Sequence, residues 1–168
     1  MRLLFAAALI ALPPFAIPAS AQPKAAPAKI VAPKVEAGVA IRASKLPVKE
    51  TIDAIAKAAE DNGAKIVARV DHAGGAKAVG VEMQPSQLLI FGNPKLGTPM
   101  MTGNPRAGLA LPLKVLAYED ATGKVWVVND VPTTIASKFK LKSKAELDAA
   151  KAAVGAIDAI MTAAAIAP

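Results

Sequence analysis

Two runs of strand-forming residues, separated by only a short polar segment, constrain the fold of this chain more than any other feature. The runs are Leu113–Tyr118 and Lys124–Val128, and they are joined by Glu-Asp-Ala-Thr-Gly. A connection this short leaves no room for a crossover, so the two strands pair antiparallel as a hairpin. The hairpin favours the α+β class over a purely parallel α/β arrangement.

Segments with helical and strand character alternate along the rest of the chain. Apolar residues at i, i+4, i+7 and i+11, followed by an Asn-Gly stop, predict a helix from Pro47 to Asn62. The other predicted elements are strands over 39–43, 66–70 and 87–91, and short helices over 73–79, 98–102 and 132–139. We therefore predict one two-layer α+β domain, with a mixed, mainly antiparallel sheet of about five strands and helices packed on one face.

A capping box, Ser143-Lys-Ala-Glu146, begins a long Ala-rich helix that is predicted to reach about residue 165. Its larger apolar residues fall on one stripe: Leu147, Val154, Ile157 and Met161. This stripe covers either the domain itself or a second subunit.

The first 21 residues have the three parts of a secretory signal. Arg2 is followed by an apolar run too short to span a bilayer, and Ala19-Ser20-Ala21 forms a cleavage site. We predict a periplasmic or secreted protein with no membrane span after signal cleavage. The predicted organisation is a signal peptide over 1–21, an Ala/Pro/Lys-rich linker over 22–37, a domain over 38–141 and an amphipathic helix over 142–168.

Composition excludes several classes of function. The chain has no cysteine, which rules out thiol redox chemistry, iron–sulfur clusters and cysteine-ligated zinc. Its formal net charge is +7, but part of this charge lies in the signal and linker, and only 4% of residues are aromatic. We therefore expect no nucleic-acid partner.

Several short strings resemble one known family in the order in which they occur: Asp71-His72, Phe91-Gly92-Asn93-Pro94, Gly97-Thr98, Asn104-Pro105, Leu111-Pro112 and the hairpin. The family is the one named domain of unknown function 302. The resemblance spans about residues 38–141 and leaves the last helix beyond the shared part. It implies a compact α+β domain that tends to dimerise, and it implies no reaction. Phe139 stands where many members have a histidine.

The candidate catalytic residues are His72, Asp71 and Glu82. Asp71 is able to orient the His72 imidazole as a general base, and Glu82 follows the same short helix. The alternative is that Asp71 caps the helix over 73–79 and His72 fills its first turn.

The segment after the third predicted strand supplies the candidate ligand-binding residues. Together with His72 and Glu82 they are Asn93, Lys95, Thr98, Met100 and Met101. Its Gly-rich start and Lys95 suit an anion at a helix N-terminus, although the same residues are ordinary turn formers. His72 with Met83, Met100 and Met101 also suits Cu(I), while methionines commonly fill gaps in cores. No metal site is assigned, and the cofactor is unknown.

Three functions follow from these patterns. The first is an exported homodimeric module that binds a small molecule or a protein partner without catalysis. The second is an enzyme of hydrolase or lyase type that uses Asp71-His72 with the Asn93 loop. The third is a copper carrier that uses His72 and methionines.

Overall fold

The computed structural model describes residues 38–166. The predicted signal peptide and linker lie outside these residues, so export stays a prediction. The strands are β1 (Val39–Ser44), β2 (Lys65–Asp71), β3 (Ser86–Gly92), β4 (Leu113–Glu119) and β5 (Val125–Asp130). The helices are α1 (Val48–Asp61), α2 (His72–Ala78), α3 (Pro94–Gly103), the 3-10 helix η2 (Pro105–Leu109), α4 (Pro132–Lys138) and α5 (Lys144–Ala163).

The five strands form one open sheet in the order β1-β5-β4-β3-β2. Each pair of neighbours is antiparallel, so the α+β prediction is confirmed and the described sheet has no parallel pair. The predicted hairpin is the β4–β5 pair. The chain crosses the whole sheet between β1 and β2, and this crossing places these two strands at opposite edges.

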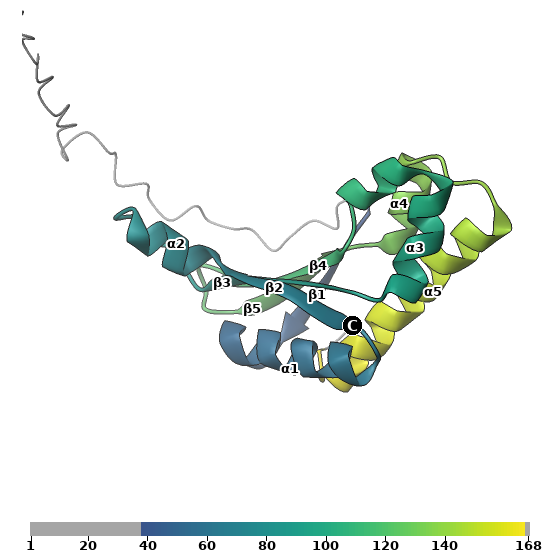
Figure 1. Ribbon diagram of the computed structural model, residues 1–168. Coiled ribbons are helices and arrows are strands. Elements are labelled where there is room, and N and C mark those ends of the chain that lie inside the picture. Colours follow the sequence, from purple (N-terminus) through teal and green to yellow (C-terminus); the bar gives the residue numbers. More distant parts are fainter. Residues whose placement is uncertain (1–37, 167–168) are drawn as a thin grey trace, which may run out of the picture.

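The helices divide between one face of the sheet and its two ends (Figure 1). Helix α1 runs along one face and contacts β2, β3 and β4. Helices α3, α4 and α5 gather at one end, where α5 contacts the other two, and α2 lies at the opposite end. Within the described residues, no helix is long and apolar enough to cross a membrane.

The main core lies between the sheet and the two helices α1 and α5. Ile52 and Ile55 of α1 are fully buried against Leu89 and Val127 of the sheet. Helix α5 closes this core with three large apolar side chains: Ile157, Ile160 and Met161. Burial of one such side chain stabilises the fold by about 1.5–3 kcal/mol.

The predicted stripe on α5 is only partly correct. Ile157 and Met161 are buried, but Leu147 is 38% exposed. The first half of the helix instead buries three alanines: Ala149, Ala150 and Ala153. Small side chains on this face let α5 lie close to α3 and α4, which a pattern of large apolar residues does not reveal.

A second, smaller cluster fills the space between α3, α4 and α5. It contains Met100, Ile135 and Phe139, all of which are buried. The carbonyl oxygen of Phe139 also accepts a hydrogen bond from the Asn104 amide, at 2.9 Å. Phe139 is therefore part of the core.

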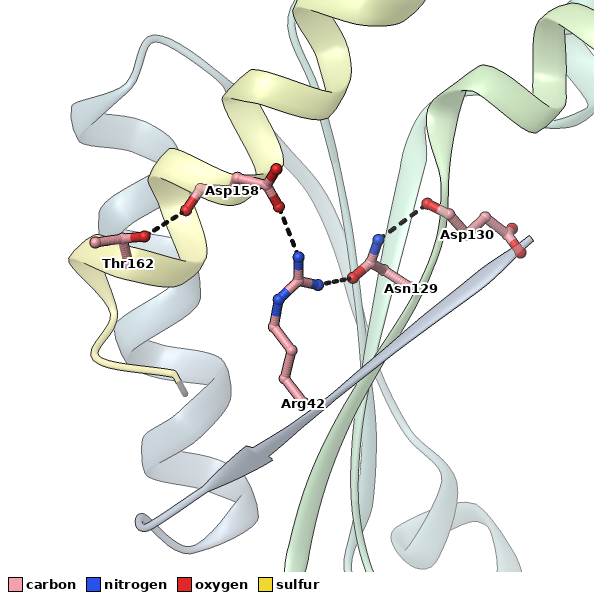
Figure 2. Close-up of polar contacts among 5 residues, drawn as sticks. All are labelled: Arg42, Asn129, Asp130, Asp158 and Thr162. Carbon is pink, nitrogen blue, oxygen red and sulfur yellow. Dashed lines mark hydrogen bonds and ion pairs between the residues drawn. The ribbon is translucent and has the colours of Figure 1, made fainter. Parts of the chain in front are cut away.

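One arginine joins the edge strand β1 to both β5 and α5 (Figure 2). The Arg42 guanidinium donates to Asn129 Oδ1 at 2.9 Å and to Asp158 Oδ1 at 2.6 Å. The Asn129 side chain is buried and donates onward to the backbone oxygen of Asp130, at 3.0 Å. The Asp158 side chain is 56% exposed, so its ion pair is well screened by solvent. The buried amide is the group that depends on Arg42 most.

The turn of the hairpin is built around the carboxylate of Asp120. This buried group accepts from the backbone amides of Thr122 and Lys124, the Thr122 hydroxyl and the Trp126 indole, over 2.6–3.1 Å. The hydrogen bonds from Thr122 and Trp126 favour the ionised form and hold the pKa of Asp120 well below its ordinary value of 3.8.

Replacement of Arg42 is expected to cost more stability than replacement of its charged partner. Arg42→Met leaves Asn129 Oδ1 without its donor and lowers the free energy of unfolding by about 1–3 kcal/mol. Asp158→Ala removes only the solvent-screened pair and costs at most about 1 kcal/mol. Urea denaturation of both variants measures the two losses. Equal losses would show that the ion pair, and not the buried amide, is what Arg42 stabilises.

The depressed pKa of Asp120 gives the fold a specific sensitivity to acid. Its contribution to stability is complete above pH 3.8 and is lost as the pH falls through the lower value of the folded state. The melting temperature of Asp120→Asn is therefore below that of the wild type at pH 7, and the gap narrows at pH 3. Fluorescence of Trp126, the chain's single tryptophan, follows the thermal unfolding of the wild type and of Asp120→Asn at each pH. Asp130→Asn, at an exposed position, serves as the control, and a gap that widens in acid would contradict the assignment.

Candidate functional site

A partly open cavity of about 300 Å³ lies where the start of β2 and the end of β3 meet α3 and α5. Apolar side chains form most of its wall: Leu96, Met100, Met101, Leu111, Leu113 and Ala153. The cavity has a size and an apolar character that are typical of small-molecule sites.

Asn93 positions the helix that forms one wall of this cavity. Its side-chain oxygen accepts from the backbone amide of Lys95 at 2.9 Å and caps α3. Its backbone oxygen accepts from the amides of Leu96 and Gly97 at 2.9 and 3.0 Å. With Pro94 in the first turn, the helix begins four residues before the predicted start at Thr98.

Two glycines keep the cavity open. A Cβ atom at Gly92 would lie 3.3 Å from the Cβ atom of Pro112, closer than most real contacts of this kind. A Cβ atom at Gly97 would lie 3.7 Å from Met101 Cε and 3.8 Å from Leu111 Cδ1, both of which are cavity walls. A larger side chain at Gly97 therefore extends into the cavity. The Leu111-Pro112 peptide bond, beside this wall, is cis.

Three polar side chains accompany the apolar walls. They belong to Lys65, Asn93 and Thr98. Lys65 begins β2, where its register partner on β3 is Gly92. Within residues 38–166 Lys65 makes no ion pair or side-chain hydrogen bond, and none of the described residues that line the cavity is acidic.

The structure brings four of the predicted ligand-binding residues to this cavity: Asn93, Thr98, Met100 and Met101. Lys95 lies outside it and lines a separate, more open hollow that Glu146 also lines. Met100 is almost fully buried, so its side chain belongs to the core as well as to the cavity wall.

His72 and Glu82 lie at the other end of the sheet from Asn93. Asp71, the residue before His72, pairs with Gln87 near the start of β3, whereas Asn93 follows the last residue of that strand. Seven residues of strand span roughly 20 Å, so the imidazole and the Asn93 loop do not converge. The same separation keeps His72 apart from Met100 and Met101.

The Asp71 carboxylate is used as a helix cap. It accepts from the backbone amide of Gly74 at 2.9 Å, at the start of α2. His72 and Glu82 are exposed, and the side chains of both make no hydrogen bond within the described part of the chain. Residues 38–166 also contain no cluster of three or more His, Cys, Asp or Glu residues that is able to hold a metal ion.

Of the fourteen described residues that line the cavity, four are predicted ligand-binding residues, and several others come from distant segments. Lys65 and Val67 come from β2, Leu113 begins β4, and Ala153 lies on α5. Within its own segment, each of these residues is typical of a strand or a helix and shows no sign of a binding role. They meet only because β2 pairs with β3 and α5 packs beside α3, and a single sequence contains no signal for either contact.

The family model described as "Domain of unknown function DUF302" matches residues 40–164 of this chain. The match includes α5, which the sequence analysis placed beyond the shared part. A crystal structure of an uncharacterized conserved protein DUF302 from Bacillus stearothermophilus superposes with a TM-score of 0.67 and 16% sequence identity. The superposition covers 76% of this chain and 98% of that one. At this identity the likeness shows the fold alone.

Curated relatives in Brucella are similar to part of the chain. They are the fluoride-specific ion channel FluC 1 of Brucella suis biovar 1 and FluC 2 of Brucella melitensis biotype 1, each 39% identical over 107 residues. These residues are 64% of this chain but only 42% and 40% of the two relatives. The chain thus spans less than half the length of these proteins, and their named activity is not transferred to it.

Proposed function

Because the chain belongs to the family described as domain of unknown function DUF302, whose match supplies a fold and no reaction, we propose a function from the cavity itself. The protein is an exported, non-catalytic module that binds a small molecule between α3, α5 and the ends of β2 and β3. The observation that carries this proposal is the apolar cavity of about 300 Å³.

The distribution of reactive side chains supports binding over catalysis. Lys65 is the one ionisable residue among the described residues that line the cavity. The candidate acid–base pair Asp71-His72 lies at the far end of β3, and its carboxylate is engaged as a cap. An enzyme that uses Asp71-His72 with the Asn93 loop requires the two to meet around one substrate, which this sheet register opposes.

A glycine-to-leucine exchange is expected to block the cavity without loss of the fold. In Gly97→Leu the new side chain extends between Met101 and Leu111 and occupies the space of a ligand. Octan-1-ol serves as an apolar probe, and saturation-transfer NMR detects its binding. We expect octan-1-ol to bind the wild type and not to bind Gly97→Leu.

The matched control is Gly155→Leu. Gly155 also lies inside a helix, and a Cβ atom there meets nothing within 4 Å. Both exchanges improve helix propensity by a similar amount, so only the position differs. Octan-1-ol binding that survives in Gly97→Leu, or that is absent from the wild type, would overturn the proposed site.

The same proposal includes a homodimer, formed through the face of the sheet opposite α1. One row across all five strands of this face is aliphatic: Ile41, Val128, Leu116, Leu88 and Val70. Four of these side chains are only partly buried, and Val70 is 38% exposed. An uninterrupted aliphatic row at the surface is typical of a face that packs against another sheet.

A second copy of the chain fits this face in extent. Five strands at the usual spacing, each six or seven residues long, give a face of roughly 24 by 20 Å. Two such faces remove on the order of 1,000 Å² from solvent, which lies at the lower end of the range of specific interfaces. The predicted α5 stripe is less suitable, because Ile157 and Met161 are already buried within their own domain.

A charge placed in the aliphatic row is expected to separate the subunits. Leu116→Lys puts an ammonium group at the centre of the interface, and light scattering after size exclusion is expected to change from dimer to monomer. Leu109→Lys makes the same exchange at a leucine that is 80% exposed outside the sheet, and it leaves the dimer intact. A monomeric wild type, or a dimeric Leu116→Lys protein, would contradict this interface.

A further inference from the structure

Lys65 is the single charged residue among the described residues that line the mainly apolar cavity. We infer that the ligand is an amphiphilic monoanion, with an apolar body inside the cavity and one carboxylate bound by Lys65. This inference rests on the proposed binding function and adds the chemical class of the ligand. Three observations on the described residues support it: Lys65 has no acidic neighbour in the cavity lining, the Asn93 side-chain nitrogen has no acceptor, and the backbone amides at the start of α3 are already hydrogen-bonded.

Lys65 has no competing partner in the described part of the chain. The nearest acidic residue before it in sequence, Asp61, already pairs with Lys57 at 2.7 Å. No carboxylate belongs to the described residues that line the cavity, and Lys65 is exposed at its rim. Opposite it on β3 stands Gly92, which has no side chain to fill the space beside the lysine stem. The ammonium group is therefore available to an anion from solution.

Asn93 contributes a second donor on the same side. Its side-chain oxygen is occupied by the Lys95 amide, at 2.9 Å, and this bond leaves the amide nitrogen outside the cap. That nitrogen makes no hydrogen bond within residues 38–166 and lies toward the turn at Gly63, 3.8 Å from a Cβ atom built there. This turn leads directly into Lys65. Both free groups are donors, so the site favours an acceptor.

The number of donors favours a monoanion over a phosphate. A phosphate is usually held by several backbone amides at a helix start. At the start of α3 those amides are already taken, because Asn93 accepts from Lys95, Leu96 and Gly97. The Lys65 ammonium and the Asn93 amide match the two oxygens of a carboxylate, and the Thr98 hydroxyl is the third polar group of the lining. The apolar walls then determine that the rest of the ligand is hydrocarbon.

A pair of probes with the same carbon chain tests this inference. Octanoate and octan-1-ol differ in the anionic group, so the ratio of their dissociation constants isolates its contribution. For the wild type at low salt we expect octanoate to bind about tenfold more tightly, as for one charge-assisted hydrogen bond. Raising the salt concentration reduces this preference, because the pair lies at an exposed rim.

Two lysine variants locate the effect. Lys65→Met keeps the apolar stem and removes the charge, so octanoate loses its roughly tenfold advantage while octan-1-ol binds as before. Lys95→Met removes a neighbouring positive charge that lies outside the cavity, and the preference for octanoate persists. Thermal melting of both variants checks that the fold is retained.

The outcomes separate this inference from the proposed function. Equal affinity of the wild type for octanoate and octan-1-ol would overturn the anion assignment and leave the cavity as an apolar site. A preference that survives in Lys65→Met would also overturn it. Binding of neither probe to the wild type would overturn the proposed function itself.

Discussion

The rest of this structure depends on the packing of α1 against one face of an antiparallel sheet, with α5 closing this core at one end. Ile52, Ile55 and Ile157 are buried there to the last few per cent of their surface. Because the chain has no cysteine, no disulfide assists this packing. The burial fixes the position of α5, and α5 in turn packs against α3 and α4. Helices α3 and α5 then form walls of the cavity. The opposite face of the sheet bears the aliphatic row.

Polar contacts then determine how the elements end and where they meet. Asp71, Asn93 and Ser143 each cap a helix through a side-chain oxygen. Arg42, on the edge strand β1, satisfies the buried Asn129 of β5, and Asp120 orders the hairpin turn. These contacts bury little apolar surface. Each of them pairs a donor or acceptor that would otherwise lack a hydrogen bond and destabilise the fold. The site described above follows from one of them, because the Asn93 cap sets the start of α3 and with it one wall of the cavity.

The sequence was sufficient for local structure and insufficient for contacts between distant segments. The hairpin, the α1 period, the Asp71 cap and the Ser143 capping box are properties of a few consecutive residues, and each predicted element is present. The predicted start of α3, at Thr98, is four residues late. The proline-rich segment before it has the composition of a turn, and only the Asn93 cap shows that the helix begins there. The sequence does not single out Lys65, because its place at the cavity follows from the pairing of β2 with β3, in which Lys65 lies opposite Gly92. The grouping of His72 with the Asn93 loop required β2 and β3 to run parallel, because His72 follows β2 and Asn93 follows β3; the two strands are antiparallel, so these residues lie at opposite ends.

A crystal structure of the protein, purified from cells without added ligands, tests the central claim most directly. The account predicts electron density for a bound molecule in the cavity between α3 and the ends of β2 and β3, with an acidic group next to Lys65 and an apolar body against Leu96 and Met101. A cavity closed by its own side chains, with the Lys65 ammonium paired to a carboxylate of the protein, would contradict it.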